Sequence, residues 1–325
     1  MPFNIFVKVI FMDLKLFCGV MCAVGMFLFG IDIMGDGLQR LCGSKMRSIL
    51  ALCTKSRLRG VLTGLTVTGI IQSSSATTIM AVSFINSGAM TLGQAVGIIM
   101  GANIGTTVTS LLIAVNFSAI APILVFLGTA LKLFSKKERV QNIGLAITGF
   151  GLLFVAMSNM TEYLSFFKES DKAAELINMC DGRIKSIIIG FIITAIMQSS
   201  SATVGVLQSA CRSGLVTTRN AVYILFGQNI GAVVPTLLST VKTNREAKRA
   251  ALVHLWFNVL GSGIFMVICE LTPYLSLLDR IEDGSFRVSI AHIIFNAVST
   301  VILLPFGDML SEIAVKSENL LHKKG

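Results

Sequence analysis

The strongest constraint on the fold is an internal duplication, because any fold for this chain must accommodate two related halves. A shift of 126 positions aligns residues 72–77 with residues 198–203, and both stretches have the sequence QSSSAT. Between residues 72–105 and 198–231, 17 of 34 positions are identical without a gap. We call residues 72–75 the first QSSS motif and residues 198–201 the second.

The expected solvent of this chain is a lipid bilayer, since only 14% of its residues are charged and 54% are hydrophobic. The net charge of +10 does not indicate a nucleic-acid partner, because the bases cluster beside apolar segments. Residues 39–59 carry six bases and no acid, and residues 132–139 and 242–249 each carry four bases against one acid. By the positive-inside rule these runs face the cytoplasm, whereas the mixed-charge loops 162–185 and 272–287 lie outside.

We therefore predict an all-α, polytopic membrane protein with two inverted-topology repeats, because the first copy follows a cytoplasmic basic run and the second an external loop. The predicted single transmembrane transport domain, residues 1–325, comprises repeat 1 at about 15–134, repeat 2 at about 140–271, an extra span at about 288–306 and a short cytoplasmic tail at 307–325. The predicted spans are 15–38, 90–117, 118–134, 140–160, 215–241, 250–271 and 288–306.

The segments 61–87 and 186–212 do not fit as plain spans, because each has a polar QSSS motif at its centre. A broken helix at membrane depth survives only where protein, water or ligand satisfies its backbone groups. We expect each segment to be a re-entrant hairpin of two half-helices. Serine is a strong N-cap, so half-helices that begin at Ser73 and Ser199 would direct unpaired N–H groups and positive dipole ends at the bilayer centre.

Two such helix starts would suit an anion, and the same hydroxyl, amide and carbonyl oxygens would suit a small cation. Serine side chains in membrane helices often serve only to hydrogen-bond one helix to its neighbour. Two identical motifs in a duplication favour a pseudo-two-fold transport site instead.

A second repeated string places an amide between two glycines, as Gly101-Ala-Asn103-Ile-Gly105 and as GQNIG at residues 227–231, where Asn229 is the amide. The simpler explanation is small-residue packing of helices. We favour an unwound stretch whose carbonyls and asparagine amide line an ion path, because glycine on both sides of a buried amide weakens a helix.

No Asp, Glu, Lys, Arg or His occurs in residues 60–131 or 186–211, so the serines have no base beside them and we predict no enzyme activity. His254 and His292 are expected to be helix-end or packing residues rather than proton carriers. Asp32 and Asp36 are expected to lie at the membrane interface rather than to bind an ion. Arg212 and Arg219 are placed at the external mouth of the second copy, either to attract anions or as solvated charges.

These residues together resemble the type II sodium/phosphate cotransporter family: paired QSSS motifs, each followed by a Gly-x-Asn-Ile-Gly string. Residues 25–30, with the sequence GMFLFG, and residues 34–38, with the sequence MGDGL, are similar to its bacterial branch. The resemblance covers about residues 15–306. It implies a multi-pass protein of a bacterial cell membrane that imports inorganic phosphate with sodium as coupling ion and needs no other cofactor.

By the same resemblance, phosphate and sodium are expected to bind at shared residues, and no separate metal site is expected. These are Gln72, Ser73, Ser74, Ser75, Thr77, Asn103, Gln198, Ser199, Ser200, Ser201, Thr203 and Asn229. Some bacterial members carry a soluble helical domain after the membrane part, and this chain ends about 19 residues beyond the last predicted span. The residues themselves leave open another oxyanion or a small carboxylate, proton coupling, or an uncoupled channel or scaffold.

Overall fold

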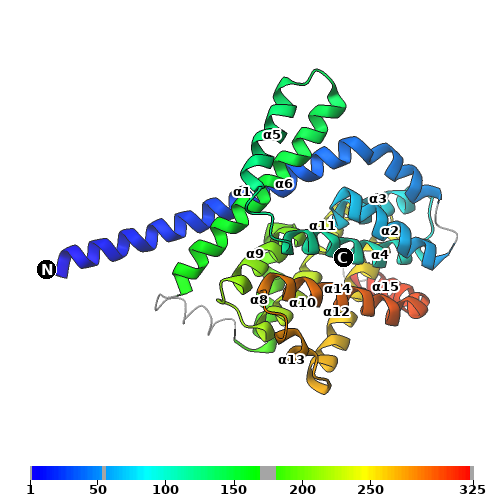
Figure 1. Ribbon diagram of the computed structural model, residues 1–325. Helices are drawn as coiled ribbons and strands as arrows, with labels where there is room; N and C mark the ends of the chain where they lie inside the picture. The colour runs from blue at the N-terminus through cyan, green and yellow to red at the C-terminus, as the bar shows by residue number, and fades with distance from the viewer. Residues whose placement is uncertain (1, 53–55, 169–180, 323–325) are drawn as a thin grey trace.

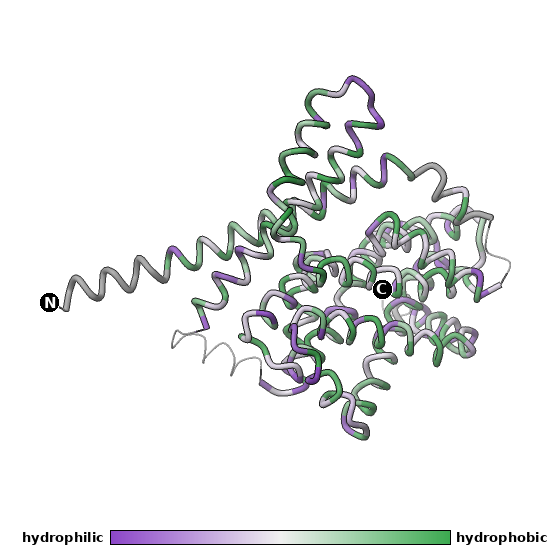
Figure 2. The backbone as a smooth tube through the Cα atoms, in the orientation of Figure 1, coloured by the Kyte–Doolittle hydropathy of each residue, from purple (hydrophilic) through white to green (hydrophobic). Residues whose placement is uncertain are grey.

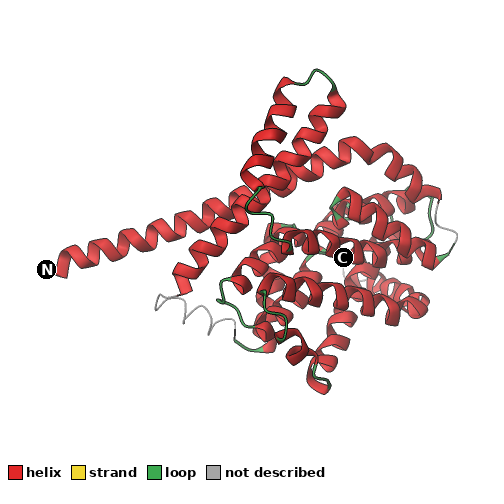
Figure 3. Cartoon of the chain, viewed as in Figure 1, coloured by secondary structure: helices red, strands yellow, loops and turns green. Residues whose placement is uncertain are grey.

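The computed structural model describes residues 2–52, 56–168 and 181–322, and within these ranges the chain is helical with no strand (Figure 3). Parts of three predicted segments lie outside the described residues. These are residues 53–55 of the first basic run, 169–180 of the expected external loop and 323–325 of the tail.

The helices follow one another along the chain as Figure 1 shows. They are α1 (Pro2–Leu52), α2 (Arg57–Ile71), α3 (Ser74–Asn86), α4 (Leu92–Ala114), α5 (Ala121–Phe134), α6 (Glu138–Lys168), α8 (Arg183–Met197), α9 (Ser200–Arg212), α10 (Thr218–Gly231), α11 (Val234–Ser239), α12 (Arg245–Leu271), α13 (Tyr274–Asp279), α14 (Gly284–Leu303), the 3-10 turn η1 (Leu304–Phe306) and α15 (Gly307–His322).

Among the described residues, six helical segments are long and apolar enough to cross a bilayer. They are Leu14–Cys42, Leu92–Ala114, Glu138–Lys168, Thr218–Ser239, Arg245–Leu271 and Gly284–Leu303. Figure 2 shows apolar residues distributed along these helices and polar residues concentrated at several of the turns. The prediction of an all-α polytopic membrane protein is confirmed, and each of these segments overlaps one predicted span.

The span predicted at residues 118–134 is shorter in the structure. A turn precedes it, in which the Ser118 N–H donates to Asn116 Oδ1 at 3.1 Å, and α5 begins only at Ala121. Its 14 residues reach about 21 Å at 1.5 Å per residue, less than the hydrocarbon core of about 30 Å. The helix packs along the first part of α6, and this hairpin projects from the rest of the molecule, whereas α6 as a whole also packs along α1 (Figure 1).

Two helices lie at the centre of the molecule, one from each copy. The most apolar windows of α4 and of the α10–α11 segment are 78% and 72% buried, against 17% for the span within α1. Helix α4 contacts α2, α3, α9, α12, α14 and α15. It is therefore the shared support for helices from both copies.

Glycine allows each central helix to lie directly against its neighbour. A Cβ added at Gly101 would lie 2.0 Å from the Val61 carbonyl oxygen of α2, and one at Gly64 would lie 2.1 Å from that of Ile98. The second copy repeats both contacts. A Cβ at Gly227 would lie 1.9 Å from the Ile187 oxygen, and one at Gly190 would lie 2.0 Å from the Ile224 oxygen. The α2/α4 and α8/α10 pairs are thus held backbone to backbone by small residues.

The segment predicted only as a cytoplasmic tail forms helix α15, which packs on α12 and α4. Glu318 is 5% exposed, and the Arg245 guanidinium donates to both of its carboxylate oxygens, with Nε to Oε1 and Nη2 to Oε2 both at 2.8 Å. The Trp256 indole also donates to Ser317 Oγ at 3.0 Å. Residues 307–322 are therefore an integral part of the helical body.

Candidate functional site

Each QSSS motif divides two helices at a glutamine with a left-handed backbone. Gln72 has φ 61° and ψ 24° after α2, and Gln198 has φ 52° and ψ 21° after α8. In the described part of the chain, they are the only residues other than glycine with positive φ. A side chain in this region of backbone space costs about 1–3 kcal/mol, and such strain clusters at functional sites.

A serine N-cap follows each glutamine and starts the next helix. Ser73 Oγ accepts from the Ala76 N–H at 3.2 Å, and Ser199 Oγ accepts from the Ala202 N–H at 3.3 Å. The helix starts at Ser74 and Ser200, so the first-turn N–H groups that the cap leaves over have no acceptor within the helix. The predicted helix starts at the serine motifs are present in both copies.

Threonine pairs connect the two helices on either side of each break. The Thr68 hydroxyl donates to Thr77 Oγ1 at 2.9 Å, and the Thr194 hydroxyl donates to Thr203 Oγ1 at the same distance. Thr77 is fully buried and Thr203 is 1% exposed. In this structure both threonines stabilise the turn, and their oxygens already have partners.

The glutamines of the two motifs differ in their surroundings. Gln72 is 7% exposed; its amide nitrogen donates to the Gly69 carbonyl oxygen, and its Oε1 is buried without a partner. Gln198 is exposed. One serine is buried in each motif, but at different positions: the central Ser74 in the first and the last, Ser201, in the second are each 8% exposed. The others, Ser73, Ser75, Ser199 and Ser200, are half-buried.

The expected unwound stretches around Asn103 and Asn229 are wrong. Helix α4 runs without a break through residues 101–105, and α10 continues to Gly231. The asparagine amides donate to the carbonyl oxygens four residues earlier, at 2.9 Å for Asn103 and 2.8 Å for Asn229. The flanking glycines serve the close helix contacts described above, which was the simpler explanation.

Both asparagines make polar contacts with helices outside the duplication's best-matched part. Asn103 Oδ1 lies 3.4 Å from His254 Nε2 of α12, and the Asn296 amide of α14 donates to Asn229 Oδ1 at 3.4 Å. His254 is 1% exposed and His292 2%, both within their helices. Of the two expected roles, helix-end or packing residue, the structure supports packing for both histidines.

Gln228 is a residue that sequence analysis passed over. Its amide donates to the Thr203 carbonyl oxygen at 2.9 Å, and its Oε1 is buried without a partner. Gln228 therefore contacts α9 two residues beyond the second motif, and its side-chain oxygen is an unpartnered acceptor among the described residues. The sequence offered one clue to Gln228: it lies within the second glycine string, at the position where the first copy has Ala102.

The structure brings together the members of each copy but shows no hydrogen bond between the two motifs among the described residues. Helices α3 and α9 both pack against α4, and α12 and α14 also contact α4. The described part of the chain contains no group of three or more His, Cys, Asp or Glu side chains that could hold a metal ion. The motif residues themselves offer neutral oxygen and N–H groups.

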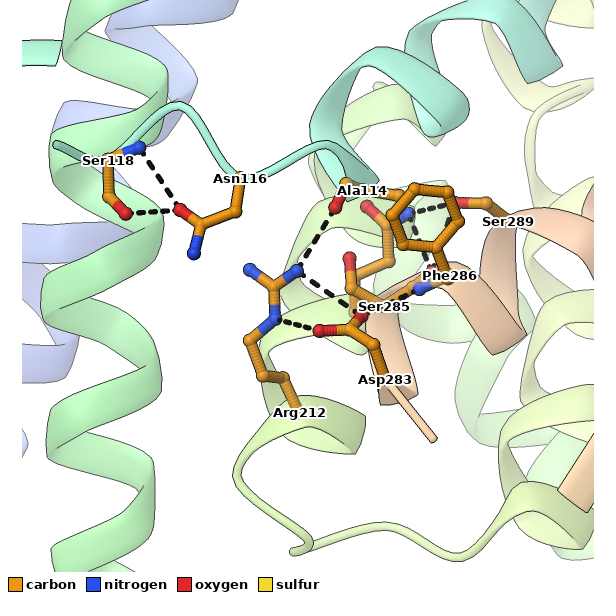
Figure 4. A network of polar contacts seen from close by, with 9 residues as sticks. Ala114, Asn116, Ser118, Arg212, Asp283, Ser285, Phe286 and Ser289 are labelled. Carbon is orange, nitrogen blue, oxygen red and sulfur yellow. Dashed lines mark hydrogen bonds and ion pairs between the residues drawn. The ribbon is translucent and has the colours of Figure 1, made fainter. Parts of the chain in front are cut away.

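A charged network closes one end of α9, as Figure 4 shows. Arg212 Nε donates to Asp283 Oδ2 at 3.0 Å, and its Nη2 donates to the Ala114 carbonyl oxygen at 3.1 Å. Asp283 also caps α14 by accepting from the Phe286 N–H at 2.9 Å. The guanidinium thus ties the ends of α4, α9 and α14, and Asp283 already balances its charge. Arg219 lies 3.9 Å from Glu270.

We predict that Asp283→Asn lowers the melting temperature in detergent at neutral pH by roughly 1–3 °C. Burial raises the pKa of Asp283, but the Phe286 N–H and the Arg212 hydrogen bond and charge outweigh it, so the pKa is lowered overall. A lowered pKa stabilises the fold above the unfolded value of about 3.9 and loses that contribution as the pH falls through the folded value. The difference between the two proteins in thermal unfolding should therefore vanish in acid, and an equal difference at all pH values would contradict the assignment.

The sequence is similar to curated bacterial proteins along most of its length. The chain is 27% identical over 285 residues to "Uncharacterized protein YqeW" of Bacillus subtilis (strain 168), covering 87% of this chain and 92% of the relative. It is 26% identical over 297 residues to "Putative inorganic phosphate export protein YjbB" of Escherichia coli (strain K12), covering 90% of this chain and 54% of the relative. The chain thus spans about half the length of YjbB.

A human protein, "Sodium-dependent phosphate transport protein 2B", is 37% identical over 150 residues, which are 42% of this chain and 22% of the relative. No solved structure gives a significant match. The six apolar helices and the bacterial relatives identify a multi-pass protein of a bacterial cell membrane. The sequence profile described as "Na+/Pi-cotransporter" matches residues 26–162 and 164–276, which is more than half of the chain. The chain therefore belongs to the Na+/Pi-cotransporter family.

Proposed function

We propose that this chain is a secondary active transporter that imports inorganic phosphate by sodium-coupled symport through a central site built from the two QSSS motifs. The observation that carries the proposal is the pair of left-handed glutamines, Gln72 and Gln198, each followed by a serine-capped helix start. One strained break would be a local irregularity. Two at equivalent positions of a duplication fit a site with pseudo-two-fold symmetry.

The phosphate would bind at the two helix starts. Backbone N–H groups in the first turns of α3 and α9, together with the hydroxyls of Ser74, Ser75, Ser200 and Ser201, supply hydrogen-bond donors for phosphate oxygens. The positive dipole ends of both helices favour negative charge. We propose that the two starts approach one shared oxyanion from opposite sides.

Sodium would bind at the neutral oxygens next to these donors. Gln72 Oε1 is a buried acceptor without a partner beside the first motif, and Gln228 Oε1 is its counterpart beside the second. Oxygen ligands suit a hard cation. Asn103 and Asn229 lie on the helices that support the motifs and remain proposed sodium ligands, provided that they exchange their present hydrogen bonds.

Electrostatics explains why the anion needs an accompanying cation. A divalent anion that enters a cell with a negative interior works against about 2.3 kcal/mol per charge per 100 mV, or about 4.6 kcal/mol for two charges. Residues 60–131 and 186–211 contain no basic side chain, so the motifs cannot neutralise phosphate themselves. Two bound sodium ions would make the loaded carrier neutral.

The proposed topology is a single domain, residues 1–325, of two inverted repeats in which α2–α3 and α8–α9 are re-entrant hairpins. The charge pattern supports it, since basic residues precede α2 and a mixed-charge loop precedes α8. Alternating access would then arise from movement of one repeat against the other around the site. We propose no enzymatic role, because the serines lack a neighbouring base.

The direction of transport follows from the ion gradients rather than from the fold alone. The relative YjbB is named for phosphate export, whereas an inward sodium gradient drives symport inward. A coupled carrier is reversible. We therefore expect the same protein to run outward when the sodium gradient is reversed.

Uptake into proteoliposomes tests the function. With membrane potential clamped, an inward sodium gradient is expected to drive phosphate accumulation above equilibrium, and replacement of sodium by choline at fixed pH is expected to abolish it. Sulfate and arsenate in counterflow identify the oxyanion class. Equilibration of phosphate without accumulation would instead indicate an uncoupled channel, and accumulation driven by a pH gradient alone would indicate proton coupling.

A further inference from the structure

A basic pocket lies where α8 and α10 begin, away from the QSSS motifs. It has a volume of about 520 Å³ and is lined by Asp181, Gly182, Arg183, Ile184, Lys185, Arg219 and Asn220. Both helices present their N-terminal ends here, with α8 starting at Arg183 and α10 at Thr218. We call it the α8/α10 pocket.

In the first copy a side chain caps the N-terminus of the corresponding helix, α2, whereas in the second copy no side chain at the equivalent position caps α8. Ser56 caps α2 by accepting from the Arg59 N–H at 3.3 Å. The equivalent position, 126 residues later, is Gly182, which has no side chain and makes no cap hydrogen bond. Among the described residues no side chain caps the first N–H groups of α8, and these groups lie at this pocket.

A buried amide provides an independent observation. In the first copy, Gln94 Oε1 accepts from the Thr91 N–H at 2.8 Å and completes a capping box. The equivalent residue in the second copy is Asn220, which is one methylene shorter. Its side chain is only 6% exposed and lines the pocket, and it makes no hydrogen bond within the described part of the chain. The amide of Asn220 is therefore a hydrogen-bonding group at the pocket that a bound ligand can pair with.

The charges around the pocket favour an anion. Arg183, Lys185 and Arg219 face it, against Asp181 and Glu270, so one positive charge is in excess. Glu270 pairs with Arg183 at 2.6 Å and lies 3.9 Å from Arg219. Lys185 has no ion pair among the described residues. The first copy also has bases at the positions of Arg183 and Lys185, but it has Gly93 at the position of Arg219, so the third base is specific to the second copy.

We propose that the α8/α10 pocket binds a phosphate group. The group is held by the uncapped start of α8, the Asn220 amide and the side chains of Lys185 and Arg219, and it is either inorganic phosphate or the headgroup of an anionic phospholipid. Three independent differences between the copies, at positions 182, 219 and 220, converge on one pocket. Helix starts combined with basic side chains are a common means of binding phosphate oxygens.

The test separates this pocket from the transport site. Binding of radiolabelled inorganic phosphate is measured without sodium in the Ser74→Ala/Ser200→Ala protein, reconstituted in nanodiscs of phosphatidylcholine. We expect sodium-independent binding that weakens at least tenfold on Lys185→Gln/Arg219→Gln. The matched control is Arg59→Gln, which removes a base at the position of the first copy equivalent to Lys185 and is expected to change binding less than twofold.

A second arm identifies the source of the phosphate group. Native mass spectrometry of protein from phosphatidylglycerol nanodiscs is expected to show retained lipid if the headgroup is the ligand, and retention is expected to fall on Lys185→Gln/Arg219→Gln. Asn220→Ala provides a neutral variant that tests the same pocket without a change of charge. Elution as a single species in size-exclusion chromatography establishes that each variant is folded.

The proposal is overturned if neither phosphate binding nor lipid retention depends on Lys185, Arg219 and Asn220, or if Arg59→Gln has the same effect. The result is independent of the proposed transport function, because the measured protein lacks the central serine of each motif and the binding is measured without sodium. Loss of sodium-dependent uptake would not alter the expected sodium-independent binding.

Discussion

Ser74→Ala or Ser200→Ala is expected to reduce sodium-dependent phosphate uptake by about 10- to 150-fold while protein abundance in the membrane is unchanged. In the proposed site each hydroxyl donates to the anion at the start of α3 or α9, and a hydrogen bond to a charged group contributes about 1.5–3 kcal/mol. A factor of ten in binding corresponds to about 1.4 kcal/mol. Initial rates of radiolabelled phosphate uptake in proteoliposomes measure the loss.

The chain supplies matched controls for this experiment. Ser83 and Ser209 occupy equivalent positions further along α3 and α9, and Ser83 donates to its own helix, to the Ile79 carbonyl oxygen at 2.9 Å. Ser83→Ala and Ser209→Ala remove the same atom from the same helices and are expected to keep more than half of the uptake. Unchanged uptake in both motif variants would defeat the assignment of the site.

Gly101→Ala is expected to destabilise the protein by about 3 kcal/mol or more, the upper range for overpacking. The new Cβ would lie 2.0 Å from the Val61 carbonyl oxygen, and backbone atoms cannot move aside as a flexible side chain can. Helices α2 and α4 would have to separate, which also displaces the first QSSS motif. Thermal unfolding in detergent and the yield of monodisperse protein measure the effect.

A glycine-to-alanine substitution at a position with open space should not destabilise the protein. Gly263 lies within α12, and a Cβ there meets nothing within 4 Å. Gly263→Ala is expected to be neutral or to stabilise the helix by up to about 1 kcal/mol. If Gly101→Ala and Gly263→Ala unfolded at the same temperature, α4 would not be packed backbone to backbone on α2.

The features that could be predicted from the sequence are those that local chemistry determines. Serine after a polar break is a strong N-cap, and the structure begins α3 and α9 at the predicted serine motifs. Hydropathy located the apolar helices because a bilayer needs about 20 apolar residues per span. The glutamines at positions 72 and 198 were predicted as site residues, but nothing local showed that their backbone would be left-handed.

The features that could not be predicted depend on contacts between distant segments. Whether glycine weakens a helix or lets another approach depends on the neighbour, so Gly101 and Gly105 alone could not exclude an unwound stretch. The packing of α15 through Arg245 and Glu318 joins residues 73 positions apart, and no local pattern encodes it. Gln228 was missed because the first copy has alanine at its equivalent position.

The two copies have similar helix breaks at the QSSS motifs, but they differ in the exposed residues where their helices begin. Both have the glycine contacts and the threonine pairs at nearly the same distances. The second copy alone has the uncapped α8 start and Arg219. A shared core with different surfaces is consistent with a common central site that is reached from two different aqueous sides.

An experimental structure with bound sodium and arsenate, located by the anomalous signal of arsenic, tests the central claim most directly. The account predicts one oxyanion within hydrogen-bond distance of first-turn N–H groups of both α3 and α9, with sodium at neighbouring oxygens. An oxyanion held by one motif alone, or by neither, would contradict it.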